Sequence, residues 1–243
     1  MKHFFFAAAL AVPFFLFTAV ATAEETKKLK DEAELSYVET GGNTELTSFS
    51  AKNLLTWQAS DDITLEWLLA ALYGESNDDK VAERYATDLK LQYSFTERLY
   101  ALVHGGWAKD EFSGIENRYY VGPALGLRIL TGPTHLLQTE AGVDYVKEEY
   151  TDDSDDDFPR GRLFAKYEFV LTEKTRFSQS GEYLHDFEDG DQYQVNSETA
   201  VITALSDALS LKTSYVVAYD NDPIPEDLEK TDTMLAVTLV VNF

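Results

Sequence analysis

Apolar and polar residues alternate over long stretches of this chain. The pattern is plainest from Thr233 to Phe243, where every second residue is apolar, namely Leu235, Val237, Leu239, Val241 and Phe243. A period of two is typical of a β-strand, whereas a helix repeats its apolar positions every three or four residues. Because the aromatic Phe243 continues the apolar face, this segment favours a strand that meets a bilayer boundary.

The same alternation recurs in eleven earlier segments, so the sequence predicts twelve strands. They are expected at about residues 31–40, 44–58, 63–73, 84–95, 99–107, 119–129, 137–145, 162–171, 174–187, 193–201, 209–220 and 233–243. The weakest is 174–187, because Gln179 and Gly181 interrupt its apolar face.

Strand length and connection length favour a membrane barrel over a soluble sandwich, which is the alternative. The expected strands have about ten to fifteen residues, where soluble strands usually have about five or six. Tight connections such as 60–62 and 96–98 alternate with longer or more acidic ones such as 148–160 and 221–230. Outer-membrane barrels show this pattern, with their short turns on the periplasmic side. The predicted fold is therefore an all-β, transmembrane, antiparallel up-and-down β-barrel of about twelve strands over residues 31–243.

Aromatic residues gather toward the predicted strand ends, as expected of the two girdles of a membrane barrel. One group is expected at the inner rim and another at the outer rim. The inner group is Trp57, Tyr93, Phe95, Phe169, Phe177 and Phe243, and the outer group is Tyr37, Tyr73, Tyr85, Trp107, Tyr119, Tyr145, Tyr183, Tyr193 and Tyr219.

The first residues have the features of a secretory signal peptide. Lys2 gives a basic start, an apolar run follows from Phe4 to Val20, and Ala21-Thr22-Ala23 supplies the A-x-A cleavage pattern. We expect a signal peptide at 1–23 with cleavage after Ala23, and a short polar periplasmic leader at 24–30. An uncleaved membrane anchor is the alternative, and Pro13 within the run argues against it.

Charge and cysteine content narrow the classes of partner. The chain has 20 basic and 43 acidic residues, a formal net charge of −23, which becomes one unit more negative if Lys2 is removed with the signal. Such a balance argues against nucleic acid as a partner, since phosphate binding needs a basic face. No cysteine is present, so disulfides and thiolate metal sites are excluded.

The acidic run 151–158 is the sharpest local signal. Asp153, Asp155 and Asp157 have the alternating spacing of a calcium loop, but Phe158 stands where that loop needs glycine. We therefore expect no cofactor and no firm metal site. The run is interpreted as a solvated acidic loop, with loose Ca²⁺ or Mg²⁺ bridging to lipopolysaccharide phosphates as the alternative.

The predicted lumen carries charges of both signs, which fits either a water-filled pore or a closed ion-pair network. These residues are Glu66, Arg84, Asp88, Lys90, Arg128, Glu140, Asp144, Lys166, Glu168, Arg176, Glu182, Asp186, Glu198 and Lys212. A barrel lipid hydrolase would need a Ser–His pair. His185 and His104 have no serine at a suitable strand spacing, so no catalytic residue is expected.

Several short motifs resemble those of the YdiY-like family of salt-induced outer-membrane proteins, a domain of unknown function. They are Gly42-Asn43-Thr44, Glu97-Arg98-Leu99-Tyr100, the segment 110–115 followed by Arg118, Gly122 and Gly126, and Thr231-Asp232-Thr233 leading into Phe243. The resemblance covers essentially the whole chain after the signal, and it implies an outer-membrane β-barrel with no established reaction or substrate.

Together these patterns predict a non-enzymatic outer-membrane protein that contributes to envelope permeability or integrity under salt or osmotic stress. A barrel lipid hydrolase and a structural, cation-bridging surface protein are the alternatives. The expected partners are outer-membrane lipid and lipopolysaccharide, and the barrel-assembly machinery, for which Leu235, Val237, Leu239, Val241 and Phe243 are the predicted assembly signal. The sequence leaves the oligomeric state open.

Overall fold

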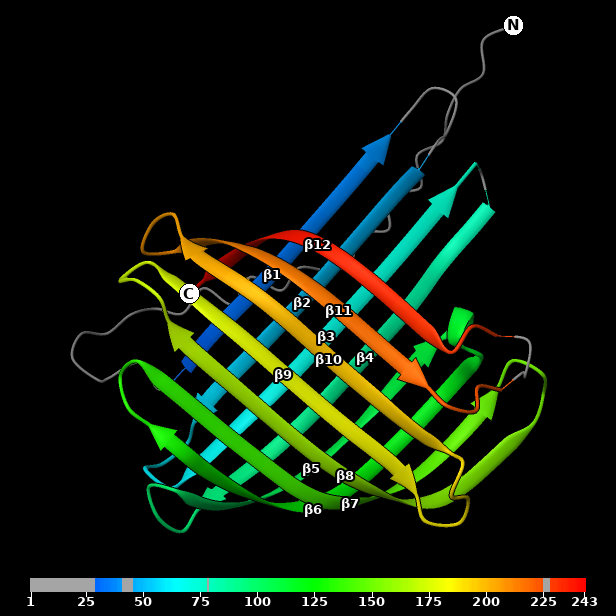
Figure 1. Ribbon diagram of the computed structural model, residues 1–243, viewed down its shortest axis with the longest axis horizontal. Helices are drawn as coiled ribbons and strands as arrows, with labels where there is room; N and C mark the ends of the chain where they lie inside the picture. Colours follow the sequence, from blue (N-terminus) through cyan, green and yellow to red (C-terminus); the bar gives the residue numbers. More distant parts are fainter. Residues whose placement is uncertain (1–28, 41–45, 78, 225–227) are drawn as a thin grey trace, which may run out of the picture.

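The computed structural model describes residues 29–40, 46–77, 79–224 and 228–243. They form a closed barrel in which each strand pairs antiparallel with its sequence neighbours and β1 meets β12 (Figure 1). The strands are β1 (Leu29–Thr40), β2 (Leu46–Gln58), β3 (Ile63–Ser76), β4 (Asp79–Ser94), β5 (Leu99–Asp110), β6 (Ile115–Thr131), β7 (His135–Tyr150), β8 (Asp155–Val170), β9 (Thr175–Asp186), β10 (Tyr193–Ala204), β11 (Leu209–Asp220) and β12 (Thr231–Asn242). This confirms the predicted fold class.

The barrel begins slightly earlier than expected. β1 starts at Leu29, so it includes two residues assigned above to the polar leader. The predicted signal peptide 1–23, its cleavage site after Ala23 and the rest of the leader lie outside the described residues, so they stay predictions.

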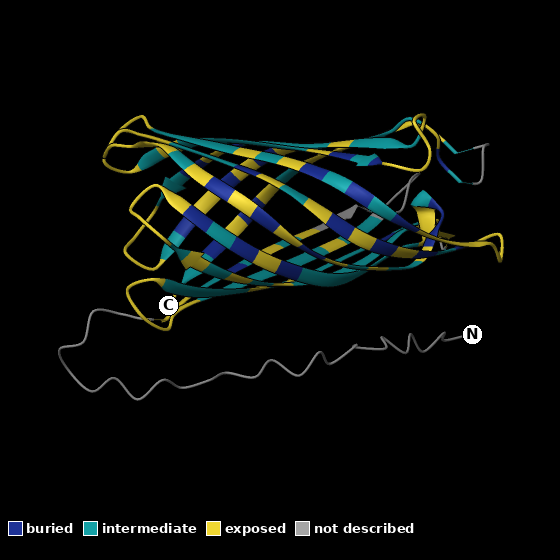
Figure 2. Cartoon of the chain, turned by 90° about the horizontal axis from the view of Figure 1, so that it is seen from below, coloured by how far each residue is buried: buried dark blue, intermediate teal, exposed yellow. Residues whose placement is uncertain are grey.

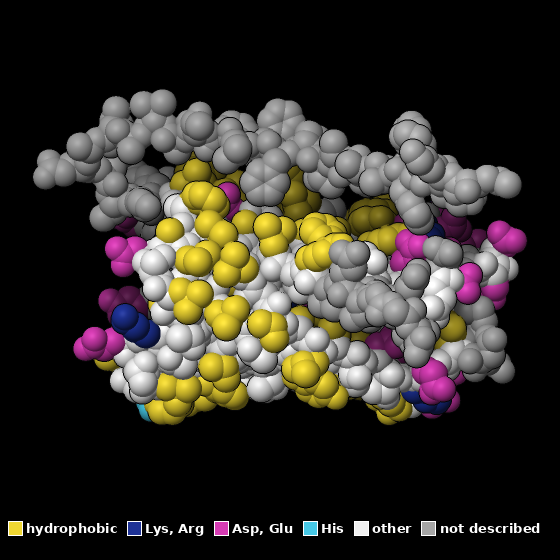
Figure 3. All heavy atoms as spheres, turned by 90° about the horizontal axis from the view of Figure 1, so that it is seen from above, with side chains coloured by type: hydrophobic (Ala, Val, Ile, Leu, Met, Phe, Trp, Pro, Cys, Tyr) yellow, Lys and Arg dark blue, Asp and Glu magenta, His cyan; other side chains and the backbone are white. Residues whose placement is uncertain are grey.

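Alternation along each strand separates an outer apolar face from an inner polar one. On β4, Leu89 and Leu91 are exposed, whereas Lys90 between them points inward to Glu66 and Glu140. Buried and exposed positions consequently form bands along the strands (Figure 2). In Figure 3 hydrophobic side chains cover the middle of one face, and acidic side chains lie toward its two ends. An apolar band between polar rims is the arrangement that suits a hydrocarbon layer.

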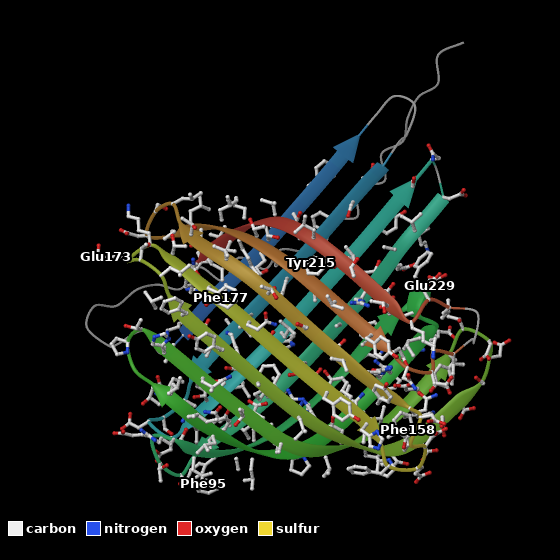
Figure 4. The ribbon with its side chains drawn as sticks, in the orientation of Figure 1. Phe95, Phe158, Glu173, Phe177, Tyr215 and Glu229 are labelled. Carbon is white, nitrogen blue, oxygen red and sulfur yellow. The ribbon has the colours of Figure 1, made fainter. Side chains whose placement is uncertain are left out.

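Tight turns gather at the end of the barrel that holds the C-terminus. Backbone hydrogen bonds close them, for example from Thr96 N to Leu99 O at 3.1 Å and from Ser206 N to Leu209 O at 3.0 Å. Phe95 and Phe177 lie toward this end in Figure 4, and Glu229 lies at the opposite end. The predicted alternation of turns between the two rims is thus present.

Two of the expected connections, 148–160 and the one between the predicted strands 99–107 and 119–129, are shorter than expected. The first was expected to include the acidic residues up to Asp157, but β7 and β8 continue through most of it, with Glu148 opposite Asp156 and Glu149 opposite Asp155. In the second, β5 runs to Asp110 and β6 starts at Ile115, with a 3₁₀ turn between them. Two paired strands can continue past the apolar band into water, because polar side chains are solvated there. The hydropathy pattern therefore does not mark where the strands end.

Candidate functional site

The lumen holds three acidic side chains in line on β7. Glu140, Asp144 and Glu148 are spaced by four residues, so in a strand they point to the same face. All three are buried, and each meets a cation from a neighbouring wall. We call these three residues the acidic ladder; it divides into an inner, a middle and an outer rung.

The inner rung is Glu140, which accepts hydrogen bonds from three strands. Arg162 Nη1 of β8 donates to its Oε2 at 2.9 Å, and Tyr100 OH of β5 donates to its Oε1 at 3.1 Å. Lys90 Nζ of β4 lies 3.4 Å from the same Oε1. Arg162 also donates from Nε to Glu182 of β9 at 2.7 Å. This rung therefore links β4, β5, β7, β8 and β9 through side chains alone.

The middle rung is Asp144, which joins a guanidinium to an imidazole. Arg160 Nη2 donates to its Oδ2 at 3.0 Å, and His104 Nε2 lies 3.0 Å from its Oδ1. The other ring nitrogen of His104 lies 3.3 Å from Asp88 Oδ2, which also accepts from Tyr120 OH at 2.9 Å. A histidine between two carboxylates extends the network from β7 across β5 to β4.

The outer rung is Glu148, whose two oxygens are both occupied. Arg118 Nε of β6 donates to Oε1, and Tyr150 OH donates to Oε2 at 2.8 Å. In each rung a tyrosine hydroxyl belongs to the network, which gives the remaining carboxylate lone pairs partners. Buried carboxylates are tolerated only when they are paired and hydrogen-bonded in this way.

Glycines on β6 make room for the ladder. A Cβ at Gly126 would lie 2.1 Å from Cζ of Tyr100, and a Cβ at Gly122 would lie 2.0 Å from the carbonyl oxygen of Val143 and 2.4 Å from Oδ1 of Asp144. Gly126 and Gly122 are also part of the family resemblance described above. The structure gives these glycines a steric role, since any larger residue would displace Tyr100 or Asp144.

Other charged residues of the lumen are much more accessible to water. The side chains of Glu66, Lys166 and Glu198 are 37%, 40% and 29% exposed, against 1% for Glu140. They belong to β3, β8 and β10. The lumen thus combines a desolvated ion-pair network centred on β7 with ionised groups that face water.

A smaller cluster joins β1 to β10 and β11. Lys212 Nζ lies 3.0 Å from Glu34 Oε2 and 2.7 Å from Glu198 Oε1. Lys212 is opposite Thr238 of β12, so the ammonium reaches past the closing strand to β1. We call Lys212, Glu34 and Glu198 the closing cluster.

A small cavity of about 20 Å³ adjoins the outer rung. Its lining includes Glu148, Arg160, Asp186 and Gln194. Among the described residues, Arg160 Nε is one of two buried side-chain nitrogens without a hydrogen-bond partner. The cavity has room for one water molecule and offers it both donors and acceptors.

The sequence placed most of these lumenal charges correctly but missed one part of the network. Glu140 and Asp144 come together with Asp88 and Lys90 as expected. Glu148 and Arg160 were assigned to a loop, and Arg118, Tyr100 and Tyr120 were not considered as lumenal. The four-residue spacing of Glu140, Asp144 and Glu148 was the available signal. It places all three side chains on one face of a strand, and thus indicates that the strand continues past its expected end.

The histidines do not form a hydrolytic pair in the part of the chain that is described. His104 contacts Asp88 and Asp144, and His135 Nδ1 lies 2.8 Å from Tyr167 OH. His185 stacks beside Tyr183 on the outer face and its Nδ1 has no partner. In the described residues, the side-chain hydrogen bonds of these histidines go to Asp88, Asp144 and Tyr167, and none goes to a serine.

The aspartates of the acidic run do not converge. Asp153 lies in the turn with a φ of 68°, and Asp155 and Asp157 lie in β8, where Asp157 accepts from Tyr145 OH. Asp152 accepts hydrogen bonds from the hydroxyl and the backbone N–H of Ser154. These bonds lower the pKa of Asp152, and the hydroxyl bond is the main cause. Within the described ranges no group of three or more His, Cys, Asp or Glu is placed to hold a metal ion.

The predicted assembly residues lie on the outer face of β12. Leu235, Val237, Leu239 and Phe243 are exposed, and Val241 is half-buried. The structure thus shows one continuous apolar stripe. Recognition of this stripe by the barrel-assembly machinery stays a prediction.

Solved structures share this architecture at low sequence identity. An outer-membrane channel of the COG4313 group from Pseudomonas putida F1 matches with a TM-score of 0.54 and 13% identity, over 91% of this chain and 97% of the channel. The NanC porin matches with a TM-score of 0.50 and 8% identity, over 88% of this chain and 97% of the porin. At these identities the likeness shows the fold alone, which is a closed antiparallel β-barrel like those of these two outer-membrane proteins.

A curated relative and a family model cover most of the chain. The uncharacterized protein YdiY of Escherichia coli (strain K12) is 27% identical over 219 residues, which are 89% of this chain and 84% of YdiY. The family model described as "Protein of unknown function, DUF481" matches residues 33–243. The resemblance drawn from the sequence motifs is thereby confirmed, and the chain belongs to the DUF481 family.

Proposed function

We propose that the protein is a non-enzymatic outer-membrane channel for ions and small polar solutes that contributes to envelope permeability under salt or osmotic stress. The observation that carries the proposal is the division of the lumen. Charged groups around the acidic ladder are desolvated, whereas Glu66, Glu182, Glu198 and Lys166 remain accessible to water. Water that reaches ionised groups along the lumen supports a narrow aqueous path beside the network.

The accessible groups favour cations. Glu66, Glu168, Glu182 and Glu198 outnumber the accessible cations Arg84, Lys166 and Arg176, and an acidic lining raises the local concentration of counter-ions. Asp110 and Asp232 near the outer end, joined through Ser113 Oγ, add to the negative potential. The stress part of the proposal rests on the family resemblance, and the outer-membrane location on the fold and on the predicted signal peptide.

Single-channel recording tests the proposal. Purified protein in a planar bilayer should give discrete current steps, and its reversal potential under a salt gradient should indicate cation preference. The double variant Glu66→Gln/Glu198→Gln should reduce that preference, while Asp153→Asn in the outer turn serves as a control of equal charge change per site. A folded barrel that carries no current at any voltage would contradict the proposal.

A deletion strain addresses the physiological part. Loss of the protein should change growth at high salt, and the wild-type gene should restore it. Complementation by Glu66→Gln/Glu198→Gln that is as good as wild type would separate the stress role from cation passage.

A further inference from the structure

Two of the short motifs that resemble the family meet across the outer end of the barrel. Ser113 lies in the 3₁₀ turn η1 (Glu111–Ser113) between β5 and β6, and its Oγ lies 3.3 Å from Oδ2 of Asp232 in β12. The strands β1 to β4 separate β12 from β5 around the wall. This contact therefore spans the mouth of the barrel and does not follow its wall. In Figure 1 η1 is drawn in green beside the start of β12 in red.

The same turn touches the connection between β11 and β12. Gly114 has a φ of 78°, and a Cβ placed on it would lie 1.8 Å from the carbonyl oxygen of Ile224 and 3.0 Å from Cδ1 of Leu228. Glycine is required here, because it alone combines this φ with so close an approach of backbone. Thr151 N of the β7–β8 turn donates to the carbonyl oxygen of Gly114 at 3.0 Å. Three connections of the rim therefore converge on one glycine.

The lumen is covered at its outer end beside β7 and β8. Val146 is opposite Tyr120 of the lumenal network, so it faces the lumen, and Phe158 is opposite Val146. Val146 and Phe158 are 0% and 8% exposed, and Figure 4 shows Phe158 toward the outer end. By contrast, the side chains of Lys166 and Glu168, nearer the inner end of β8, are 40% and 25% exposed.

The part of the outer lumen that stays accessible to water runs along β12. Asp232 and Met234 share the face of Thr238, which is opposite lumenal Lys212, and both are exposed. The contact between Ser113 and Asp232 lies in this part. A path for ions toward the outer end therefore has to pass the place where η1 meets β12.

We infer that this contact is an outer gate, which consists of η1 and Gly114 on one side of the mouth and Ile224 and Asp232 on the other. At rest the gate narrows the path along β12, and it opens when η1 moves away from Ile224 and Asp232. The ladders of the wall stay intact during this movement. Outside the apolar band the polar groups of the gate can exchange protein partners for water at little net cost. The inference rests on the proposed conduction and adds a place at which it is controlled.

A reversible cross-link across the mouth tests the gate. Ser113→Cys/Asp232→Cys removes the contact and places one thiol on each side, and the chain has no other cysteine. The reagent 1,2-ethanediyl bismethanethiosulfonate joins the two thiols through a short spacer, and dithiothreitol releases them. The matched control is Asp191→Cys/Asn221→Cys on one side of the mouth, where Asn221 Nδ2 donates to the carbonyl oxygen of Asp191 at 2.9 Å. Full-length proteins that show heat-modifiable gel mobility are recorded in planar bilayers.

Before cross-linking, the Ser113→Cys/Asp232→Cys variant should be open roughly fivefold more of the time than the wild type, because a hydrogen bond of the closed gate is lost. Cross-linking should reduce its mean current at least fivefold, and dithiothreitol should restore the current of the same sample, which excludes misfolding. The control pair should conduct equally in both states.

The outcomes separate the gate from the proposed channel. Equal currents before and after a cross-link that mass spectrometry verifies would overturn the gate and leave the channel standing. Folded protein without current in any form, the free double-cysteine variant included, would overturn both. Current in that free variant beside a wild type that is silent at all voltages would support the gate and contradict conduction by the wild type.

Discussion

The wall around β7 and the seam between β1 and β12 close the same barrel by different means. β7 pairs with β8 from His135 opposite Phe169 to Glu149 opposite Asp155, and the acidic ladder ties both strands to β4, β5, β6 and β9. At the seam, β1 pairs with β12 over only a short register, and the closing cluster is the side-chain network that joins β1 to the strands beyond β12. The β7 wall therefore has both a long backbone ladder and lumenal ion pairs, whereas the β1–β12 seam has only a short ladder.

This difference indicates which pair of strands in the barrel can separate at the lowest cost in free energy. Buried ion pairs stabilise little by themselves but penalise any separation of their partners, because separation leaves a charge uncompensated. We therefore expect the β7 wall to be rigid and any motion of the wall to occur at the seam. Four variants test this contrast, from the largest expected effect to the smallest.

Asp144→Ala should destabilise the barrel most. It leaves Arg160 and His104 without their shared carboxylate in a site that is 3% exposed. The expected loss is about 3–5 kcal/mol of unfolding free energy, measured by urea titration of the reconstituted protein followed by heat-modifiable gel mobility. The control is Glu168→Ala, since its pair with Lys166 is partly exposed and should cost at most about 1 kcal/mol. Equal losses would mean that the ladder is not desolvated.

Gly126→Ala should be next in size. The new Cβ would lie 2.1 Å from Cζ of Tyr100, and overpacking of this kind costs about 1–3 kcal/mol. Gly181→Ala is the matched control in another strand, because no atom lies within 4 Å of its Cβ position. The same urea titration measures the unfolding free energy of both variants. A Gly126→Ala variant as stable as Gly181→Ala would show that Tyr100 does not pack against Gly126.

Lys212→Met should loosen the seam at a smaller cost. It removes the ammonium that holds Glu34 of β1 to β11, and a hydrogen bond to a charged, partly exposed group is worth about 1–2 kcal/mol. The thermal midpoint in vesicles should fall, whereas Lys166→Met, whose side chain is 40% exposed, should leave it unchanged. An unchanged midpoint for Lys212→Met would show that the closing cluster does not hold the seam.

Replacement of Asp153, Asp155 and Asp157 by Asn should have the smallest effect. These residues do not converge on a common point, so unfolding free energy should change by less than about 0.5 kcal/mol. Calorimetric titration with Ca²⁺ should give the same weak heats for the variant and the wild type. Stoichiometric Ca²⁺ binding that the variant loses would restore the cation-bridging alternative.

The sequence predicted the strands and their two faces because alternation is a direct consequence of backbone geometry. Leu89, Lys90 and Leu91 suffice to orient β4. The acidic ladder was only partly predictable. Glu148 and Arg160 lie beyond the apolar band, where strand length depends on pairing between neighbours and not on hydropathy.

The seam could not be predicted from alternation at all. Leu235 and Val237 show the same period as Leu239 and Val241, although only the latter pair lies where β12 is in register with β1. Which residues meet across a closing seam depends on the tilt and stagger of the whole barrel. A local pattern carries no information about that long-range quantity.

Amide hydrogen exchange of the reconstituted full-length protein, resolved by residue, tests the central contrast most directly. Amides of β7 between Glu140 and Glu148 should exchange slowest, and those of β12 between Thr231 and Thr238 that are not bonded to β11 should exchange at least a hundredfold faster, because opening there breaks no β1–β12 ladder. Uniform protection along β12, equal to that of β7, would contradict an open seam and with it the division of the barrel into a fixed wall and a mobile closure.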